Sequence, residues 1–255
     1  MQDLKVTLVQ ANQIWESKRA NFSNYLRLLE SINEPIDLVI FPEMFDTGFS
    51  MNVELAEDWS SNNSLNFLIE LAVGKQFAIY TSLMVRENNQ FYNRGVFIYP
   101  TGEVKHYDKR KSFGLGGEDK FYTAGKTDTI VNYKDWKINL QICYDLRFPE
   151  IARNYEIDGK PKYDLLLYVA NWPAKRVEHW KTLLKARAIE NQSYVIGVNR
   201  IGEDANGLIY SGDSSCYDPL GNIYCHLENE SIFTTTLSEF TLNTTRSSLP
   251  FLKDY

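Results

Sequence analysis

Residues 136–150 read WKINLQICYDLRFPE, and this stretch predicts a change from a strand to a helix. Apolar and polar side chains alternate from position 138 to 143, which is typical of a β-strand. Pro149 then occupies a favourable place in the first turn of a helix. Cys143 therefore ends the strand on its more polar side, where free backbone N–H groups can favour a thiolate and bind an oxyanion. Burial as a small apolar side chain is the commoner fate of a free cysteine, so both interpretations stay open here.

On the N-terminal side of this stretch, short apolar runs alternate with helical periodicity. This order of elements predicts a layered α/β fold. The predicted strands cover residues 4–10, 37–41 and 77–84, and the predicted helices between them cover residues 18–31 and 64–74.

The pattern becomes richer in strands after residue 90. We expect a hairpin over residues 94–107 and a functional or disordered loop over 108–126. We find no linker, repeat or low-complexity tract, so residues 1–255 are predicted to form a single domain. Further strands are predicted at residues 136–142, 163–169 and 194–198. A short helix is predicted at 149–155, a helix at 179–191, and a β-rich section at 214–237. The tail from residue 242 has no clear period, and we expect it to pack on a partner subunit.

The bulk composition describes an ordinary globular protein. The net charge of -6 over 255 residues argues against a nucleic-acid partner, because phosphate binding needs a basic surface. Three cysteines make no disulfide framework and suit a reducing cytoplasm. Neither a signal peptide nor a membrane span is recognisable, so we expect a cytoplasmic protein with no membrane partner.

Three charged residues outside the cysteine segment attract attention. Glu43 ends one of the most apolar stretches of the chain, and a desolvated carboxylate there is a candidate general base. Lys109 follows a predicted strand within a basic cluster, and Glu118 lies in a glycine-rich loop. Taken singly, each is more simply explained as a solvated charge.

Metal and cofactor sites are not predicted. Cys216, Cys225 and His226 fit no zinc spacing and lack a fourth ligand. The three histidines are too scattered along the chain to indicate a Cys–His dyad.

Three motifs follow one another along the chain: Phe41-Pro42-Glu43 after a strand, Tyr107-Asp108-Lys109, and the segment from Cys143 to Glu150. The motif around the cysteine is highly specific, whereas the first motif alone would be weak. Taken in this order, the three motifs resemble the nitrilase (carbon–nitrogen hydrolase) superfamily. The likeness runs from residue 4 to about residue 237.

Two further segments are Asn171-Trp172-Pro173-Ala174 and Val198-Asn199-Arg200-Ile201-Gly202. They resemble the omega-amidase branch of this superfamily, which hydrolyses 2-oxoglutaramate and similar omega-amides of 2-oxo acids. One departure is Lys111-Ser112-Phe113, where relatives usually have His-Leu-Phe. This change leaves the catalytic residues in place but makes the fine specificity an open question.

The resemblance implies a Glu-Lys-Cys triad at Glu43, Lys109 and Cys143, with Glu118 as a second carboxylate. Cys143 would form a thioester with the acyl group, and Glu43 would act as general base. Lys109 and the backbone N–H of Tyr144 would form the oxyanion hole. No cofactor and no metal are implied.

The part of the site that holds the substrate tail is less defined by the motifs. Arg176 is the candidate partner for a substrate carboxylate, and Arg147 is expected to form a structural ion pair. Trp172, Phe45 and Tyr122 are candidates to line a small pocket, and each is equally compatible with a place in the core.

The resemblance further implies a four-layer α-β-β-α sandwich that forms a homodimer or a larger homo-oligomer. The alternatives are an N-carbamoyl amide hydrolase or a nitrilase of the same superfamily. A scaffold protein that kept the fold without the activity is the alternative of another class.

Overall fold

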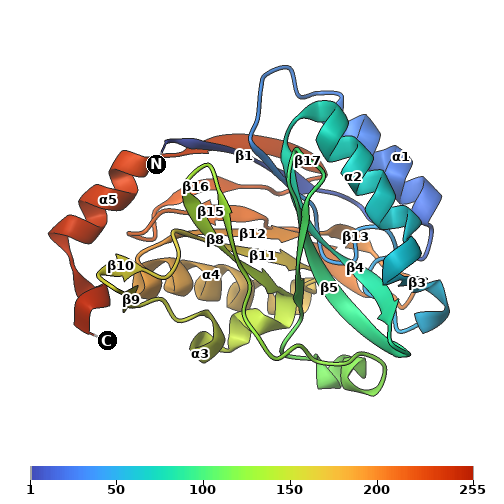
Figure 1. The fold of residues 1–255 in the computed structure, drawn as a ribbon. Helices are drawn as coiled ribbons and strands as arrows, with labels where there is room; N and C mark the ends of the chain where they lie inside the picture. The colour runs from blue at the N-terminus through green and yellow to red at the C-terminus, as the bar shows by residue number, and fades with distance from the viewer. Residues whose placement is uncertain (1, 255) are drawn as a thin grey trace.

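In the computed structural model, which describes residues 2–254, two β-sheets pack face to face between helices (Figure 1). The strands of the first sheet are β1 (Leu4–Gln10), β2 (Leu38–Ile40), β3 (Glu57–Asp58), β4 (Ala78–Glu87), β5 (Gln90–Ile98), β6 (Val104–Asp108) and β17 (Ser231–Leu237). Their order is β17-β1-β2-β4-β5-β6, with β3 beside β4. The strands β1, β2 and β4 are parallel to one another, and β3 is parallel to β4. In contrast, β17 is antiparallel to β1, β5 to β4, and β6 to β5.

The second sheet has the order β16-β15-β12-β11-β8-β7. Its strands are β7 (Ile130–Tyr133), β8 (Trp136–Ile142), β11 (Leu165–Ala170), β12 (Tyr194–Asn199), β15 (Ser215–Tyr217) and β16 (Ile223–His226). The helices α1 (Lys18–Leu29) and α2 (Asn63–Lys75) cover the first sheet, and α4 (Val177–Asn191) covers the second (Figure 1). The predicted α-β-β-α sandwich is therefore confirmed.

The two sheets are held together by a shared apolar core. Leu8 and Ile40 of the first sheet and Leu140 of the second are fully buried in one cluster. Polar contacts also cross this core; the hydroxyl of Tyr80, for example, donates to the carbonyl oxygen of Gln141 at 2.9 Å. The strands that carry the site are thereby fixed relative to one another, since dense packing permits little movement.

The β4–β5 hairpin was not predicted. Asn88 and Asn89 join its strands with φ values of 51° and 60°, as a type I′ turn requires. Asparagine tolerates this conformation, and the Asn-Asn pair was the available signal. Two short ribbons were also not predicted: that of β9 (Glu156–Ile157) and β10 (Lys160–Pro161), and that of β13 (Ile201–Glu203) and β14 (Ile209–Ser211). The helix predicted at residues 149–155 is present as α3 (Pro149–Ala152), but it ends earlier than predicted.

The C-terminal segment contains a helix, α5 (Glu239–Ser248), where no period was recognised. The side chain of Ser238 caps it by accepting from the backbone N–H of Thr241, and Leu242 is buried. Arg246 forms an ion pair with Asp164 at 2.5 Å, which attaches the helix to the second sheet. Contact of this segment with a partner subunit stays a prediction.

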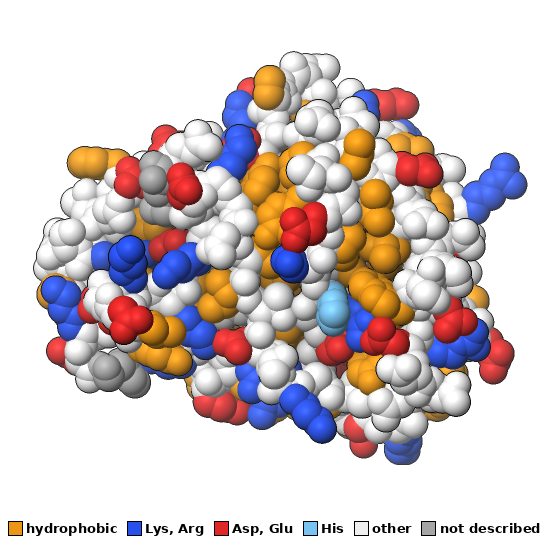
Figure 2. Space-filling view, viewed as in Figure 1, with side chains coloured by type: hydrophobic (Ala, Val, Ile, Leu, Met, Phe, Trp, Pro, Cys, Tyr) orange, Lys and Arg blue, Asp and Glu red, His pale blue; other side chains and the backbone are white. Residues whose placement is uncertain are grey.

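The surface mixes charges of both signs. On the face drawn in Figure 2, acidic and basic side chains are interspersed, and apolar side chains gather near the middle of the view. None of the helices within residues 2–254 combines the length and the hydropathy needed to cross a membrane.

A single glycine allows α4 to lie directly on the second sheet. Gly197 is in the middle of β12, and a Cβ added there would come within 2.4 Å of Leu184 and 2.6 Å of Trp180, both on α4. Real Cβ atoms do not approach other atoms so closely, so any larger residue must displace the side chains of Leu184 and Trp180. The ring of Trp180 in turn packs on Trp172, with 5.5 Å between ring centroids.

We therefore predict that Gly197→Ala lowers the free energy of unfolding by about 1 to 3 kcal/mol, the usual cost of overpacking. Gly74→Ala is the matched control, because nothing lies within 4 Å of a Cβ added at that helical position. Ala is favoured over Gly in helices, so the control should be stabilised by about 0.5 to 1 kcal/mol. Urea denaturation of both variants measures the difference, and equal effects would contradict the packing argument.

Candidate active site

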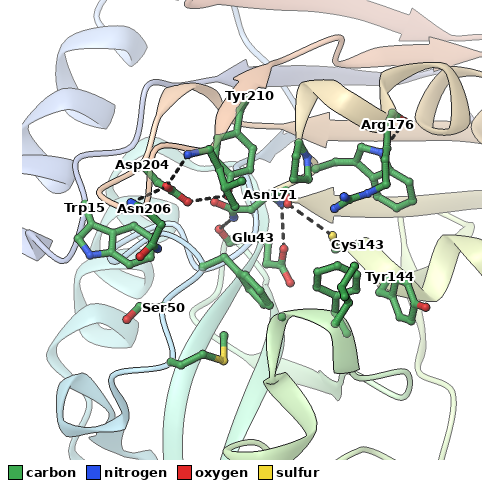
Figure 3. Close-up of a pocket in the computed structure, with 18 of the residues that line it drawn as sticks. Trp15, Glu43, Ser50, Cys143, Tyr144, Asn171, Arg176, Asp204, Asn206 and Tyr210 are labelled. Atoms are coloured by element: carbon green, nitrogen blue, oxygen red, sulfur yellow. Dashed lines mark hydrogen bonds between the residues drawn. The ribbon is translucent and has the colours of Figure 1, made fainter.

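A cavity of about 640 Å³ lies where strands of both sheets end (Figure 3). Glu43 follows β2 of the first sheet, and Lys109 follows β6. Cys143 and Asn171 follow β8 and β11, which are parallel neighbours in the second sheet. Ligands of open α/β sheets bind at the carboxyl ends of such strands. The four residues line the same cavity although they are far apart in the sequence.

Cys143 occupies a strained corner at the end of β8. Its φ is 43°, in the left-handed region that residues other than glycine rarely adopt, and such outliers cluster at functional sites. The chain continues as a short 3-10 helix, Cys143–Arg147. The carboxylate of Asp145 stabilises the corner by accepting from the backbone N–H of Ile142 and Lys111 and from the hydroxyl of Tyr107, each at 2.9 Å.

Cys143 is 9% exposed, and its thiol contacts the carbonyl oxygen of Asn171 at 3.9 Å. Burial and the negative charge of Glu43 raise the pKa of Cys143 well above its usual value, and Lys109 only partly opposes this. The expectation that the corner favours a thiolate is therefore wrong for the unliganded protein. A neutral thiol needs a base to become a nucleophile.

Glu43, Lys109 and Glu118 form a buried charge cluster. Lys109 Nζ donates to Oε1 of Glu43 and to both carboxylate oxygens of Glu118, each at 2.9 Å. All three side chains are at most 3% exposed. Burial alone would lower the pKa of Lys109, but Glu118 and Glu43 outweigh it, so the net pKa is raised and the ammonium persists. Glu118 does not line the cavity and lies behind Lys109.

Two asparagines that the sequence did not single out hold the carboxylates in place. Asn93 Nδ2 donates to Glu43 at 2.7 Å and to Glu118 at 3.2 Å. The backbone N–H of Asn171 donates to Oε2 of Glu43 at 2.9 Å, and its side-chain amide donates to the Glu43 carbonyl at 2.6 Å. Asn171 begins the motif Asn171-Trp172-Pro173-Ala174 of the family resemblance, which was the available signal for its role.

Two arginines lie on one wall of the cavity near Cys143. Neither Arg147 nor Arg176 forms an ion pair within the described part of the chain. Arg147 instead contacts Nδ1 of His179 at 3.3 Å and lies 4.6 Å above the ring of Trp172, so the predicted structural ion pair is wrong. Arg176 lies 5.3 Å above the ring of Phe113. Unpaired guanidinium groups in a cavity suit a carboxylate ligand.

The other predicted residues of the cavity divide into two groups. Tyr144 and Trp172 line the cavity, as expected. Phe45 is fully buried among the aromatic rings of the first sheet and its helices, so its placement in the pocket is wrong. Tyr122 lies one layer behind the wall, where its hydroxyl donates to the carbonyl of Ser50 at 2.7 Å. The side chain of an apolar residue just after a strand can face either the core or the cavity. The sequence alone does not show which of the two it faces.

The wall opposite the arginines was not recognised in the sequence. Trp15 and Glu16 contribute from the segment between β1 and α1. Asp204, Asn206 and Tyr210 contribute from the β13–β14 ribbon. No group of three or more His, Cys, Asp or Glu side chains in residues 2–254 is arranged to hold a metal ion.

Comparison with known proteins identifies one family over nearly the whole chain. The carbon–nitrogen hydrolase family model matches residues 5–248. An omega-amidase, YafV of Yersinia enterocolitica, is 43% identical over 229 residues, which cover 89% of this chain and 86% of the relative. A 2-oxoglutaramate amidase of Paenarthrobacter nicotinovorans is 34% identical, with 86% of this chain and 78% of the relative covered.

Solved structures agree with the observed fold. XC1258 of Xanthomonas campestris, a CN-hydrolase superfamily protein with an arsenic adduct in its active site, superposes with a TM-score of 0.97. It is 41% identical, and the match covers 100% of this chain and 98% of that one. Nit3 of Saccharomyces cerevisiae, a nitrilase-superfamily member at 24% identity, superposes with a TM-score of 0.85 over 99% of this chain and 96% of that one.

Asp145 makes the stability of the site dependent on pH. Burial raises its pKa from 3.8 to about 6 against the opposing hydrogen bond from Ile142. The folded protein therefore binds this proton more tightly than the unfolded chain does, and the contribution of Asp145 to stability falls as pH rises from about 4 to about 6.

We predict that the unfolding free energy of the wild type, relative to Asp145→Asn, decreases by about 2 to 3 kcal/mol across this interval. Denaturant titrations of both proteins at several pH values measure it. The variant lacks the titrating group, so a difference that does not change with pH would refute the assignment.

Proposed function

This chain belongs to the carbon–nitrogen hydrolase family, and on that premise we propose that it is an omega-amidase. It is a hydrolase that acts on amides, and its substrates are small omega-amides of 2-oxo dicarboxylic acids, such as 2-oxoglutaramate. One observation carries the proposal. A thiol and a buried Glu-Lys-Glu cluster meet at a cavity whose wall holds two arginines without acidic partners in the described chain.

In the proposed mechanism, Cys143 attacks the amide carbon and Glu43 accepts the thiol proton. The raised pKa of Cys143 supports this role for Glu43, because the thiol does not ionise unaided. The C–N bond then breaks, the proton passes from Glu43 to the departing ammonia, and a thioester remains. Water activated by Glu43 hydrolyses the thioester and restores the thiol.

Lys109 is the proposed donor to the carbonyl oxygen as it becomes negative. Its raised pKa keeps it an ammonium beside the carboxylates, and it lines the cavity. The backbone N–H of Tyr144 is the proposed second donor, because the first N–H groups of a helical turn have no partner within the turn. Glu118 has no face on the cavity, so we assign it to positioning Lys109 through two hydrogen bonds.

The two arginines are the proposed site for the carboxylate at the far end of the substrate. A guanidinium pairs with a carboxylate through two parallel hydrogen bonds, which fixes orientation as well as charge. Arg176 is the main contact. Arg147 lies near it, since burial and then the positive charge of Arg176 lower the pKa of Arg147.

We also propose that the protein works as a homodimer or larger homo-oligomer in the cytoplasm. Phe240 and Phe251 of the C-terminal segment are 74% and 55% exposed, which supports contact with a second copy. The three cysteines are unpaired, as a reducing compartment favours.

We expect ammonia release to be fastest from 2-oxoglutaramate in a panel that includes an N-carbamoyl amino acid and a simple nitrile. Cys143→Ala should lower kcat/KM for 2-oxoglutaramate by about 10³ or more, as loss of a nucleophile does. Cys225→Ala, a buried cysteine away from the cavity, is the matched control and should keep the activity. Preference for the carbamoyl compound or the nitrile would replace the omega-amidase assignment, and activity retained in Cys143→Ala would exclude the thioester.

We expect Arg176→Gln to lower kcat/KM for 2-oxoglutaramate about 10- to 100-fold, mainly through KM, because a charged hydrogen bond is worth about 1.5 to 3 kcal/mol. Arg147→Gln should have a smaller effect in the same direction. A neutral aliphatic amide of similar length has no carboxylate to lose, so its kcat/KM should change little. Equal losses on both amides would show that the arginines shape the site and do not bind the carboxylate.

A further inference from the structure

The cavity is much larger than the proposed substrate needs. Its volume is about 640 Å³, whereas 2-oxoglutaramate has only about ten non-hydrogen atoms, far fewer than the drug-sized ligands that such cavities enclose. Figure 3 shows Arg176 and Tyr144 on one side of Cys143, and Trp15, Asp204 and Asn206 on the other. Glu43 and Asn171 lie between the two sides. We call the side away from the arginines the distal chamber.

In the proposed mechanism, the leaving nitrogen of the substrate faces the distal chamber. If the substrate carboxylate binds the arginines and the amide carbon meets Cys143, the nitrogen must face Glu43 to receive its proton. A substituent on that nitrogen then extends past Glu43 and Asn171 toward Trp15. Ammonia would leave this space almost empty.

Asn171 supplies an acceptor at the entrance to the distal chamber. The residue is 5% exposed and lines the cavity, and its Oδ1 is buried without a hydrogen-bond partner. The amide orientation is fixed, because Nδ2 donates to the carbonyl of Glu43. A buried acceptor without a partner is costly, and an N–H on the scissile nitrogen would satisfy it.

Glu16 gives the distal chamber a negative charge. Its carboxylate accepts from the hydroxyl of Ser50 and from Asn52 Nδ2, and it has no ion pair within the described residues. The nearest lysine in sequence, Lys18, is paired instead with Asp46 and Glu57. Asp204 differs, because backbone N–H groups and the Tyr210 hydroxyl already fill its acceptor positions.

Aromatic rings complete the distal chamber. Trp15 and Tyr210 both line it. The buried guanidinium of Arg200 lies 4.6 Å above the Tyr210 ring, so Tyr210 is already engaged by a cation from outside the cavity. Trp15 has no such partner among the described residues. An indole beside an unpaired carboxylate is suited to an alkylammonium group.

We propose that the distal chamber is a leaving-group site for amines, so that the protein also hydrolyses N-substituted omega-amides whose amine part ends in an ammonium group. The proposal rests on the proposed function, since it uses the same thiol and the same carboxylate site. Asn171 accepts the N–H of the scissile amide, the alkyl chain lies along Trp15, and Glu16 binds the terminal ammonium.

The chemistry is that of the primary amide with a different leaving group. Cys143 forms a C–S bond to the acyl carbon, the C–N bond breaks, and the thiol proton passes through Glu43 to the nitrogen. The free amine leaves through the distal chamber. Water then cleaves the thioester to the carboxylic acid, and no further reactant is needed.

The test compares three amides of 2-oxoglutaric acid: the primary amide, the N-butyl amide and the N-aminobutyl amide with its terminal ammonium. Amine and ammonia release give kcat/KM for each. We expect both substituted amides to be hydrolysed, and kcat/KM for the aminobutyl amide to exceed that of the butyl amide about tenfold. Glu16→Gln keeps the shape and hydrogen-bonding capacity of the side chain, and it should reduce this ratio to about one.

Glu54→Gln is the matched control, because it removes the same charge from an exposed position nearby that does not line the cavity. It should leave the ratio near tenfold. Cleavage of the primary amide alone would overturn the distal chamber and keep the omega-amidase. A ratio that Glu16→Gln does not change would overturn the role of Glu16, and no cleavage of any of the three would overturn the proposed function itself.

Discussion

The site depends on one buried electrostatic cluster, in which a single ammonium neutralises part of two carboxylates. Lys109 donates to Glu43 and Glu118 at 2.9 Å, and none of the three is more than 3% exposed. Charges removed from water in this way are costly unless every partner is in place. The asparagines at positions 93 and 171 and the backbone N–H of Phe113 donate further hydrogen bonds to the carboxylates, and Asn171 comes from the opposite sheet. The packing of the two sheets is therefore a requirement for the charge cluster, and the cluster in turn fixes the base beside the thiol.

The corner at Cys143 is the second constraint, and it too is maintained from outside. A φ of 43° is unfavourable for cysteine, and it persists because Asp145 accepts three hydrogen bonds from the strand end, from the loop after β6 and from Tyr107. The carboxylate of Asp145 thus connects the segment that carries the thiol with the segment that carries Lys109. Asp145 does not line the cavity itself. Its role is to hold in place the neighbouring residues that do.

The sequence predicts the parts of this structure that depend on local pattern. β1 begins and ends where the pattern predicts it. The strand that precedes Glu43 is a short apolar run, and the strand that precedes Cys143 shows the predicted alternation of apolar and polar residues. The family motifs then indicate which polar residues meet. What the sequence does not predict is contributed by loops and non-local contacts. The ribbon that carries Tyr210 has three-residue strands without a period, and Phe45 faces the core only because α1 and α2 bring other rings to it. The neutral state of the thiol also follows from burial, which residue order does not reveal.

The charges around the cavity explain how a buried site can tolerate a thiolate at all. At rest the cluster of two carboxylates and one ammonium is negative by one charge, and a free thiolate would add a second, which is why burial and Glu43 raise the pKa of Cys143. In the proposed mechanism the thiol proton moves to Glu43, so the negative charge is relocated without being increased. As the charge passes to the substrate oxygen it approaches the ammonium of Lys109, which no longer faces a charged Glu43. Each step therefore keeps the net charge of the buried site constant. This also explains why the cluster contains two carboxylates, because Glu118 keeps Lys109 an ammonium while Glu43 is neutral.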